Sequence, residues 1–242
     1  MNNTERRFQT STVGLMAGTG DKRTMEGDAA VTGEWSTGCG WFEEMMMRGC
    51  FDTVLRSPNL ECYSLFNHEP SRVLGVTTNG ELRLAVEGGN LRQQTDLAGD
   101  TVDSQTMISH LKAKRIKRMS FAFRVNKRDH EKWYEQNGVI KREVNQVDEL
   151  FDVSPVTYAA YEGANVTMRG ISPGQDKAID DVMRTFIKCE RGLSVGATEL
   201  QSLRDFKDRI DSFLVRTAAE AQKPNQQRVT AEELRKMFDG LL

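Results

Sequence analysis

Three histidines are the side chains of this chain best suited to acid–base chemistry near neutral pH: His68, His110 and His130. A free imidazole has a pKa of about 6.5, so it can take up and release a proton under these conditions. His68 lies where an apolar run ends just before Pro70, a residue that cannot continue a central strand. A histidine at such a strand end is well placed at the edge of a cleft. His110 falls on a predicted helix and His130 in a charged loop, so His68 is the preferred candidate for a general base.

A serine lies in a run with β-strand alternation, residues 118–125, of sequence RMSFAFRV. Neighbouring side chains of a strand point to opposite faces. The bulky apolar residues therefore form one face, and Ser120 and Ala122 belong to the other. A strand of this kind would hold a hydroxyl in place and leave space beside it for a substrate. A serine on the solvated face of an edge strand has the same pattern, and spacing alone leaves both interpretations open.

Carboxylates that could orient an imidazole occur together at Asp148, Glu149 and Asp152. Orienting the base is the third role in hydrolysis by a serine and a histidine. Alternation along the predicted strand places Asp152 with Leu150 and Ser154, and Glu149 on the opposite face. Solvated charges on a strand edge would look the same, so the spacing does not choose among the three.

Other kinds of site have weaker support. The four cysteines show no CxxC spacing, which argues against a zinc centre, and we expect no metal and no cofactor. Cys62 and His68 would lie about 20 Å apart along an extended strand, too far for proton transfer. Residues 111–128 hold eight Lys or Arg and no Asp or Glu, interleaved with two phenylalanines. This segment could contact phosphates or an acidic protein partner, or form a solvated face.

The overall composition is that of a protein made and used in a cytoplasm. The chain has 242 residues, 38% hydrophobic and 28% charged, with a formal net charge of −2. No apolar run approaches the roughly 20 residues of a membrane span, and residues 1–9 have no apolar signal-peptide core. We therefore expect no membrane association and no specific nucleic-acid partner.

The elements that must position these residues are mainly strands. Asn79-Gly80 between two β-branched runs predicts a hairpin. Residues 103–114 have helical spacing, and residues 49–55 indicate a turn entering a short helix. The predicted strands are 62–66, 73–77, 81–86, 117–125, 139–144 and 147–153.

Changes in composition predict three regions: a flexible N-terminal segment at 1–34, a catalytic domain at 35–170 and a helical region at 171–242. The last region opens on a linker at 172–175. Apolar stripes follow at 179–187 and 200–213, spaced as on one helix face. A polar spacer at 221–228 and a capping box at Thr230 and Glu233 precede a last predicted helix.

Taken together, these segments resemble the prohead protease family of tailed bacteriophages. Residues 67–75 (NHEPSRVLG) resemble its NH-D/E-P…LG motif, and residues 119–123 (MSFAF) resemble its MSFGF nucleophile strand. Residues 152–161 resemble its E-V-S-x-V-T-x-P-A block, and residues 49–51 its PGAF element. The likeness covers roughly residues 40–168. Its departures are Asp152 where the family usually has Glu, and Ala159 where it often has Pro.

The resemblance implies an α+β fold similar to herpesvirus capsid maturation proteases: a mainly antiparallel β-barrel flanked by helices, here with a C-terminal helical appendage. It implies Ser120 as nucleophile, His68 as base and Asp152 as the third member, with Glu149 as the alternative. The implied activity is that of a serine endopeptidase without cofactor or metal.

The partners that the resemblance implies are the phage major capsid protein and its scaffolding segment, which the enzyme cuts inside the immature prohead in the host cytoplasm. It also implies self-cleavage, allows a homodimer, and suggests that the C-terminal helices target the enzyme into the shell. The alternative is a catalytically inactive capsid assembly or scaffolding protein with the same fold.

Overall fold

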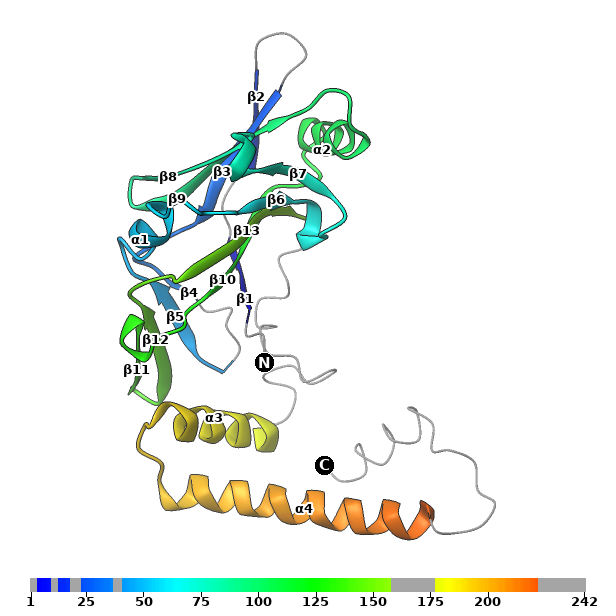
Figure 1. Cartoon of the computed structure of the whole chain (residues 1–242). Coiled ribbons are helices and arrows are strands. Elements are labelled where there is room, and N and C mark those ends of the chain that lie inside the picture. Colours follow the sequence, from blue (N-terminus) through cyan, green and yellow to red (C-terminus); the bar gives the residue numbers. More distant parts are fainter. Residues whose placement is uncertain (1–3, 10–12, 18–22, 37–40, 158–176, 222–242) are drawn as a thin grey trace. The chain divides into compact units, whose positions relative to one another are not determined.

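The computed structural model describes residues 4–9, 13–17, 23–36, 41–157 and 177–221 (Figure 1). The chain divides into two units, Met1–Ser194 and Val195–Leu242. The described part of the first unit holds all of the described strands and three helices. The described part of the second is the helix α4 (Ala197–Ala221). The predicted linker at 172–175, most of the spacer and the last predicted helix lie outside the described residues.

The first unit combines strands with a few helices, as expected for an α+β fold. Its helices are α1 (Asp52–Leu55), α2 (Val102–Lys112) and α3 (Lys177–Arg191), with short 3-10 turns at Phe66–His68, Thr77–Asn79 and Arg128–His130. Its strands are β1 (Glu5–Gln9), β2 (Val13–Ala17), β3 (Arg23–Ala30), β4 (Trp35–Ser36), β5 (Glu43–Met46), β6 (Tyr63–Leu65), β7 (Val73–Val76), β8 (Leu82–Glu87), β9 (Asn90–Leu97), β10 (Arg118–Arg124), β11 (Glu131–Gln136), β12 (Val139–Val144) and β13 (Glu149–Val156).

The described strands form three sheets. The five-stranded sheet has the order β1-β10-β13-β6-β7, and the two four-stranded sheets have the orders β11-β12-β5-β4 and β2-β3-β9-β8. Most pairs are antiparallel, but β13 runs parallel to β6 and β12 parallel to β5. The expected mainly antiparallel barrel is therefore not confirmed, because the described strands pair as three separate sheets.

The main core lies between β10 and β13 of the five-stranded sheet on one side and α1 with residues of β3, β5, β8, β9 and β12 on the other. Phe51, Phe121 and Phe123 are almost fully buried in it, with Phe121 stacked on Phe123 at 5.2 Å between ring centroids. Burying one such side chain contributes about 1.5–3 kcal/mol. The bulky face of β10 therefore holds this strand in place. The two phenylalanines interleaved with the basic residues of segment 111–128 are core residues, so neither presents a ring on which a nucleic-acid base could stack.

Two expectations from the sequence differ from the structure. Composition predicts a flexible segment at residues 1–34, yet three strands lie there: β1 pairs with β10, β3 pairs with β9, and β2 pairs with β3. Asn79-Gly80 does not close a hairpin, because β7 pairs with β6 while β8 pairs with β9 in another sheet. Gly80 has a φ of 79° and provides the left-handed turn between those sheets. In both cases long-range pairing overrides a local signal.

A buried group of charges attaches β1 to the second sheet. Glu44 on β5 accepts hydrogen bonds from Arg7 on β1 and Arg142 on β12, and Arg142 is 2% exposed. Arg142 also donates to Glu5 of β1 at 2.8 Å and to Glu131 of β11 at 2.7 Å. Buried charges are tolerated when paired in this way, and removing one partner typically costs about 3–5 kcal/mol. The pairing keeps β1 at the edge of β10.

Replacing Glu5 by Gln is expected to flatten the acid dependence of stability. Burial would raise the pKa of the Glu5 carboxyl, but hydrogen bonding and attraction from Arg142 and Arg7 outweigh it and hold the pKa below its usual range. A group with a depressed pKa stabilises the fold above its unfolded pKa of about 4.3, and this is lost as pH falls through the folded pKa. Urea unfolding between about pH 5 and pH 3 should show a smaller slope for Glu5→Gln than for the wild type. An unchanged slope would contradict the prediction, and Glu34→Gln, at an exposed position, is the control.

The helices α3 and α4 both occur where the apolar spacing predicted helix. Within the first unit, α3 packs Ile187 against Phe42 and Ile140, and its Lys188 pairs with Glu135 at 2.6 Å. On α4, by contrast, Leu200, Ile210 and Leu214 are exposed. No described helix is long and apolar enough to cross a bilayer.

Candidate active site

Three neighbouring strands of the five-stranded sheet position the candidate residues. β13 lies between β10 and β6, so a residue of β13 can reach side chains that come from both neighbours (Figure 1). Ser120 lies in the middle of β10, opposite Ser154 of β13. His68 follows β6 in the next turn, and Asp152 lies in β13 opposite Ala122. Residues separated by up to 84 positions in the sequence therefore converge on one face.

A β-bulge in β13 separates the faces of Asp152 and Leu150. The pairing advances from Ala122↔Asp152 to Phe123↔Leu150, which leaves Phe151 without a partner on β10. Leu150 consequently joins the core, while Asp152 and Ser154 share the face of Ser120. Strict alternation places Asp152 with both Leu150 and Ser154; the structure agrees for Ser154, whereas Leu150 lies on the other face because one extra residue intervenes. Bulges are common beside active sites because they re-aim a side chain in this way.

The turn that carries His68 has an unusual backbone. Asn67 and His68 have φ values of 57° and 58°, a conformation that residues other than glycine seldom adopt. Asn67 stabilises it from within the site, since its Oδ1 accepts the Thr157 amide hydrogen at 2.8 Å and its Nδ2 donates to the Thr157 hydroxyl at 3.2 Å. This ties the turn to the end of β13. Backbone strain of this sort costs about 1–3 kcal/mol and gathers at functional sites.

A second anchor holds the same turn from the side of α2. Arg72 lies over the Phe66 ring at 3.9 Å and forms an ion pair with Asp103 of α2 at 2.7 Å. Phe66 is buried against Met107 and Leu111 of that helix. The imidazole is therefore fixed between β13 and α2, as a base that must reach one particular oxygen requires.

Ser120, His68 and Asp152 form one continuous chain of hydrogen bonds. His68 Nε2 lies 2.5 Å from Ser120 Oγ, and His68 Nδ1 lies 2.5 Å from Asp152 Oδ1. All three residues are buried, with 0%, 9% and 5% exposure. With Asp152 ionised, the ring proton belongs on Nδ1, and Nε2 is then free to accept the serine proton. Ser154 donates a hydrogen bond to the same Asp152 oxygen.

A backbone carbonyl from β1 is a second acceptor beside the serine. The Ser120 hydroxyl donates to the Arg7 carbonyl oxygen at 2.8 Å. A hydroxyl has one proton, so the Arg7 carbonyl competes with His68 for it. We call the hydrogen-bonded chain of Asp152, His68 and Ser120 the relay. The structure thus contains both the relay, which would activate Ser120, and a second acceptor for the serine proton, the Arg7 carbonyl.

The other carboxylates and histidines of the sequence are bound elsewhere. Glu149 forms a bidentate pair with Arg124 at 2.9 and 3.0 Å, and Asp148 lies 2.8 Å from His130 Nδ1. His110 packs against the ring of Phe66, 5.7 Å between centroids. Of the three carboxylates considered, the structure brings Asp152 to His68.

Cys62 is close to the site but is not suited to nucleophilic attack. Its side chain is fully buried, and burial together with the nearby Asp152 charge raises the pKa of the thiol well above its usual range. A thiol must lose its proton to attack, so a raised pKa makes it inert. Burial likewise raises the pKa of Cys50, to about 12.

Sequence reasoning assigned no role to three contributors to this site. Asn67 was visible as part of the NHEP motif, and its tolerance for the left-handed region was the available signal. Ser154, two residues after Asp152, could have been found as its neighbour on one strand face. The carbonyl of Arg7 carried no signal, because the pairing of β1 with β10 joins residues 113 positions apart.

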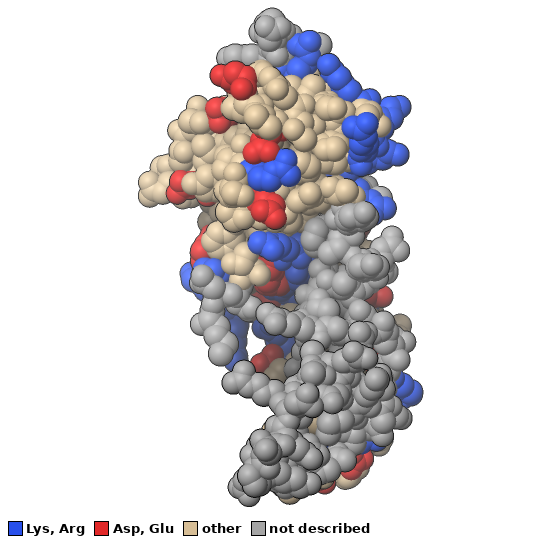
Figure 2. All heavy atoms as spheres, turned by 90° about the vertical axis from the view of Figure 1, so that its right-hand side faces the viewer, with Lys and Arg blue, Asp and Glu red and all other residues tan. Residues whose placement is uncertain are grey.

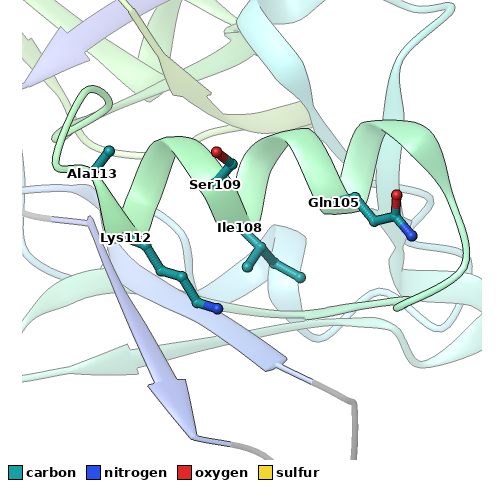
Figure 3. Close-up of a pocket in the computed structure, with 5 residues that line it drawn as sticks. All are labelled: Gln105, Ile108, Ser109, Lys112 and Ala113. Atoms are coloured by element: carbon teal, nitrogen blue, oxygen red, sulfur yellow. The ribbon is translucent and has the colours of Figure 1, made fainter.

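A shallow open depression lies away from the relay, on the surface of α2. Its lining residues come from this helix and its C-terminal cap, and Ile108 and Lys112 point to the same side of it (Figure 3): Gln105, Ile108, Ser109, Lys112 and Ala113. None of the three relay residues borders it. Among the described residues, no group of three or more His, Cys, Asp or Glu is arranged to hold a metal ion.

Comparison with known proteins agrees with the likeness in the motifs. The family model described as caudovirus prohead serine protease matches residues 9–177. A solved structure, the bacteriophage T4 capsid assembly protease gp21, is 10% identical, with a TM-score of 0.41, and the match covers 64% of this chain and 98% of that one. No curated protein matches. The family match spans more than half of the chain, and we conclude that this protein belongs to the caudovirus prohead serine protease family.

Proposed function

We propose that this protein is a serine endopeptidase of phage capsid maturation, with Ser120 as nucleophile, His68 as general base and Asp152 as the group that orients the base. The observation that carries the proposal is the unbroken hydrogen-bond chain from Asp152 through His68 to Ser120. Membership of the prohead protease family supports the same reaction. The family usually has Glu at the position of Asp152, and here the shorter Asp152 side chain lies 2.5 Å from His68 Nδ1.

The chemistry follows from the order of the three groups. Ser120 Oγ attacks the scissile carbonyl carbon while His68 Nε2 takes its proton, giving a tetrahedral intermediate and an imidazolium. Asp152 stabilises that imidazolium through Nδ1. The imidazolium then gives its proton to the leaving amine, which departs and leaves an ester on Ser120. A water molecule, deprotonated by His68, attacks the ester and restores the free serine.

Burial strengthens these interactions and also restricts access. Electrostatic attraction between Asp152 and the imidazolium is larger in a site shielded from water. Ser120 itself has no exposed surface, and a reacting carbonyl must come within about 3–3.5 Å of Oγ. Productive binding therefore requires local opening beside Ser120, and it must free the serine proton from the Arg7 carbonyl.

The proposed substrates are the scaffolding segment of the phage major capsid protein and the enzyme's own chain. The proposed place of action is the immature prohead in the bacterial host cytoplasm. Family membership supports this substrate class. The polar composition of residues 221–228 makes this spacer the proposed place for self-cleavage, because segments of small and polar residues are preferred sites of proteolysis.

Co-expression with the coat protein of the same phage, followed by mass spectrometry of both chains, tests this function. We expect the wild type to shorten the coat protein at a defined bond, and Ser120→Ala to leave it intact. A coat protein that stays intact with the wild type while shells still assemble would instead support an inactive assembly protein. Trimming of the enzyme chain is scored in the same spectra.

Replacing Asp152 by Asn is expected to slow cleavage by about 10²- to 10⁴-fold, less than the loss of Ser120 or His68. An amide at this position can present its NH₂ to Nδ1, which favours the wrong imidazole tautomer and removes the charge that stabilises the imidazolium. Glu149→Gln, which alters only the pair with Arg124 and Asn126, is expected to be nearly silent. The measurement is kcat/KM on one peptide for both variants. A reversed ranking would assign the orienting role to Glu149.

A further inference from the structure

Five exposed cations follow one another from the end of α2 to the start of β10. We call this set the basic ridge: Lys112, Lys114, Arg115, Lys117 and Arg118, all exposed. Basic side chains gather along one edge of the face shown in Figure 2, where the acidic side chains lie apart from them. The ridge falls within residues 111–128, a segment without Asp or Glu.

The side chains of the ridge have no acidic partner among the residues that the structure describes. Within the described part of the chain, none of the five makes an ion pair. Many basic residues elsewhere in the first unit are paired, for example Arg72 with Asp103, Arg83 with Asp96 and Arg124 with Glu149. The ridge is thus a local excess of positive charge on a protein whose net charge is −2.

Helix stability explains only part of this charge. Cations in the last turn of α2 interact favourably with the helix dipole and stabilise the helix by about 0.3–1 kcal/mol each. This accounts for Lys112. Lys114 is different, because it occupies the left-handed position that ends the helix, with φ of 55°. The Arg115 amide donates to the His110 carbonyl at 2.9 Å and the Lys114 amide to Leu111, the pattern for which glycine is preferred. A lysine there is kept against the local backbone preference.

The ridge leads directly into the candidate active site. Arg118 is the first residue of β10 and lies two positions before Ser120, so both belong to the same face of the strand. Two residues of extended strand span about 6.5–7 Å. A polypeptide bound at Ser120 would therefore have its flanking residues within reach of Arg118 and, further along, of Lys117 and Arg115. The depression on α2 shares Lys112 with the ridge (Figure 3).

The chemistry of the ridge favours an acidic polypeptide over a nucleic acid. Single-strand binding surfaces combine cations with exposed aromatic rings that stack on bases. Phe121 and Phe123, the aromatic residues nearest to the ridge in sequence, are fully buried in the core. The ridge ends at Arg118, the first residue of the strand that carries Ser120, so its location fits the protein substrate of a peptidase instead.

We infer that the basic ridge is a substrate-docking surface that recognises an acidic segment beside the scissile bond. This inference rests on the proposed function and adds a substrate class to it: polypeptides whose cleaved region carries clustered Asp or Glu. Each exposed ion contact is weak, so several together select a substrate without binding it too tightly for release. Screening by salt should weaken the selection.

Binding in a Ser120→Ala background, which prevents cleavage, tests the inference on the full chain. The probe is a short fluorescein-labelled peptide of alternating Glu and Ala, and its partner is the same peptide with Gln in place of Glu. The ridge variant is Arg115→Gln/Lys117→Gln. Its matched control is Lys127→Gln/Arg128→Gln, which removes one Lys and one Arg, both exposed, beyond the other end of β10. Thermal unfolding checks that both variants fold.

We expect the Glu peptide to bind, and the ridge variant to raise its Kd by about three- to thirtyfold. The control variant should leave the Kd of the Glu peptide unchanged, which would show that the effect is local. The Gln peptide should bind more weakly than the Glu peptide, which would show that binding depends on charge. Equal losses in the two variants, or no binding of the Glu peptide, would overturn the inference. Tight binding of a single-stranded oligonucleotide without binding of the Glu peptide would assign the ridge to nucleic acid.

Cleavage of coat protein separates this inference from the proposed function. A wild type that cuts nothing contradicts the function, whatever the peptide binds. A wild type and a ridge variant that cut with the same KM contradict the docking role alone. The expected result is a raised KM in the ridge variant, a kcat close to that of the wild type, and a difference between the two enzymes that shrinks as salt is added.

Discussion

Ser120→Ala is expected to lower kcat/KM for peptide cleavage by about 10⁴- to 10⁶-fold while the protein remains folded. The alanine retains everything except the oxygen, which is the atom that would attack the carbonyl. The neighbouring Ala122 on the same face is 1% exposed, so a small apolar side chain already suits this surface. The variant loses the hydrogen bonds to His68 and to the Arg7 carbonyl, which should cost no more than about 1–3 kcal/mol of stability.

The measurement is the initial rate on a coat-derived peptide, together with the midpoint of thermal unfolding for both proteins. Ser64 is the matched control, since it is also fully buried in a strand of the same sheet but lies outside the relay. Ser64→Ala should cleave at close to the wild-type rate. Wild-type rates in Ser120→Ala would remove Ser120 from the mechanism.

His68→Asn is expected to be nearly as damaging as the loss of Ser120, and the double variant little worse than either. Asparagine is the preferred test residue because it tolerates a φ of 58° and can still donate a hydrogen bond toward Asp152. His68→Ala would be harder to interpret, since it removes a hydrogen bond from the buried Asp152 carboxylate, a change that typically costs about 1–3 kcal/mol of stability.

The double variant distinguishes a shared proton from two separate effects. Residues that act as one unit lose their activity together, so the logarithms of the rate losses should not add. The measurement is kcat/KM for the wild type, both single variants and the double variant on one substrate. Additive losses would show that Ser120 and His68 do not share a proton, and the proposed mechanism would then fail.

Much of the framework follows from local pattern in the chain. The alternation of residues 118–125 predicted β10 and its apolar face, and helical spacing predicted α2, α3 and α4. These elements are predictable because each depends on the periodicity of its own side chains. The motifs around His68, Ser120 and Asp152 likewise indicated the family, which the match over residues 9–177 confirms.

Residues far apart in the chain settled the details that matter for chemistry. The sequence left Asp148, Glu149 and Asp152 as alternatives, and the pairing of β13 with β10 and β6 brings Asp152 to His68, while a bulge at Phe151 turns Leu150 into the core. A bulge depends on how two strands register against each other, so the alternation of one strand cannot reveal it.

The N-terminal strands illustrate the same limit. Polar residues such as those of β1 have little strand propensity, and β1 is held by pairing with β10 and by charges on β5 and β12. The Arg7 carbonyl reaches Ser120 only through that pairing. Composition and periodicity therefore defined the elements and the chemical groups, whereas strand register and long-range ion pairs determined which groups meet, because those contacts exist only once distant segments have packed.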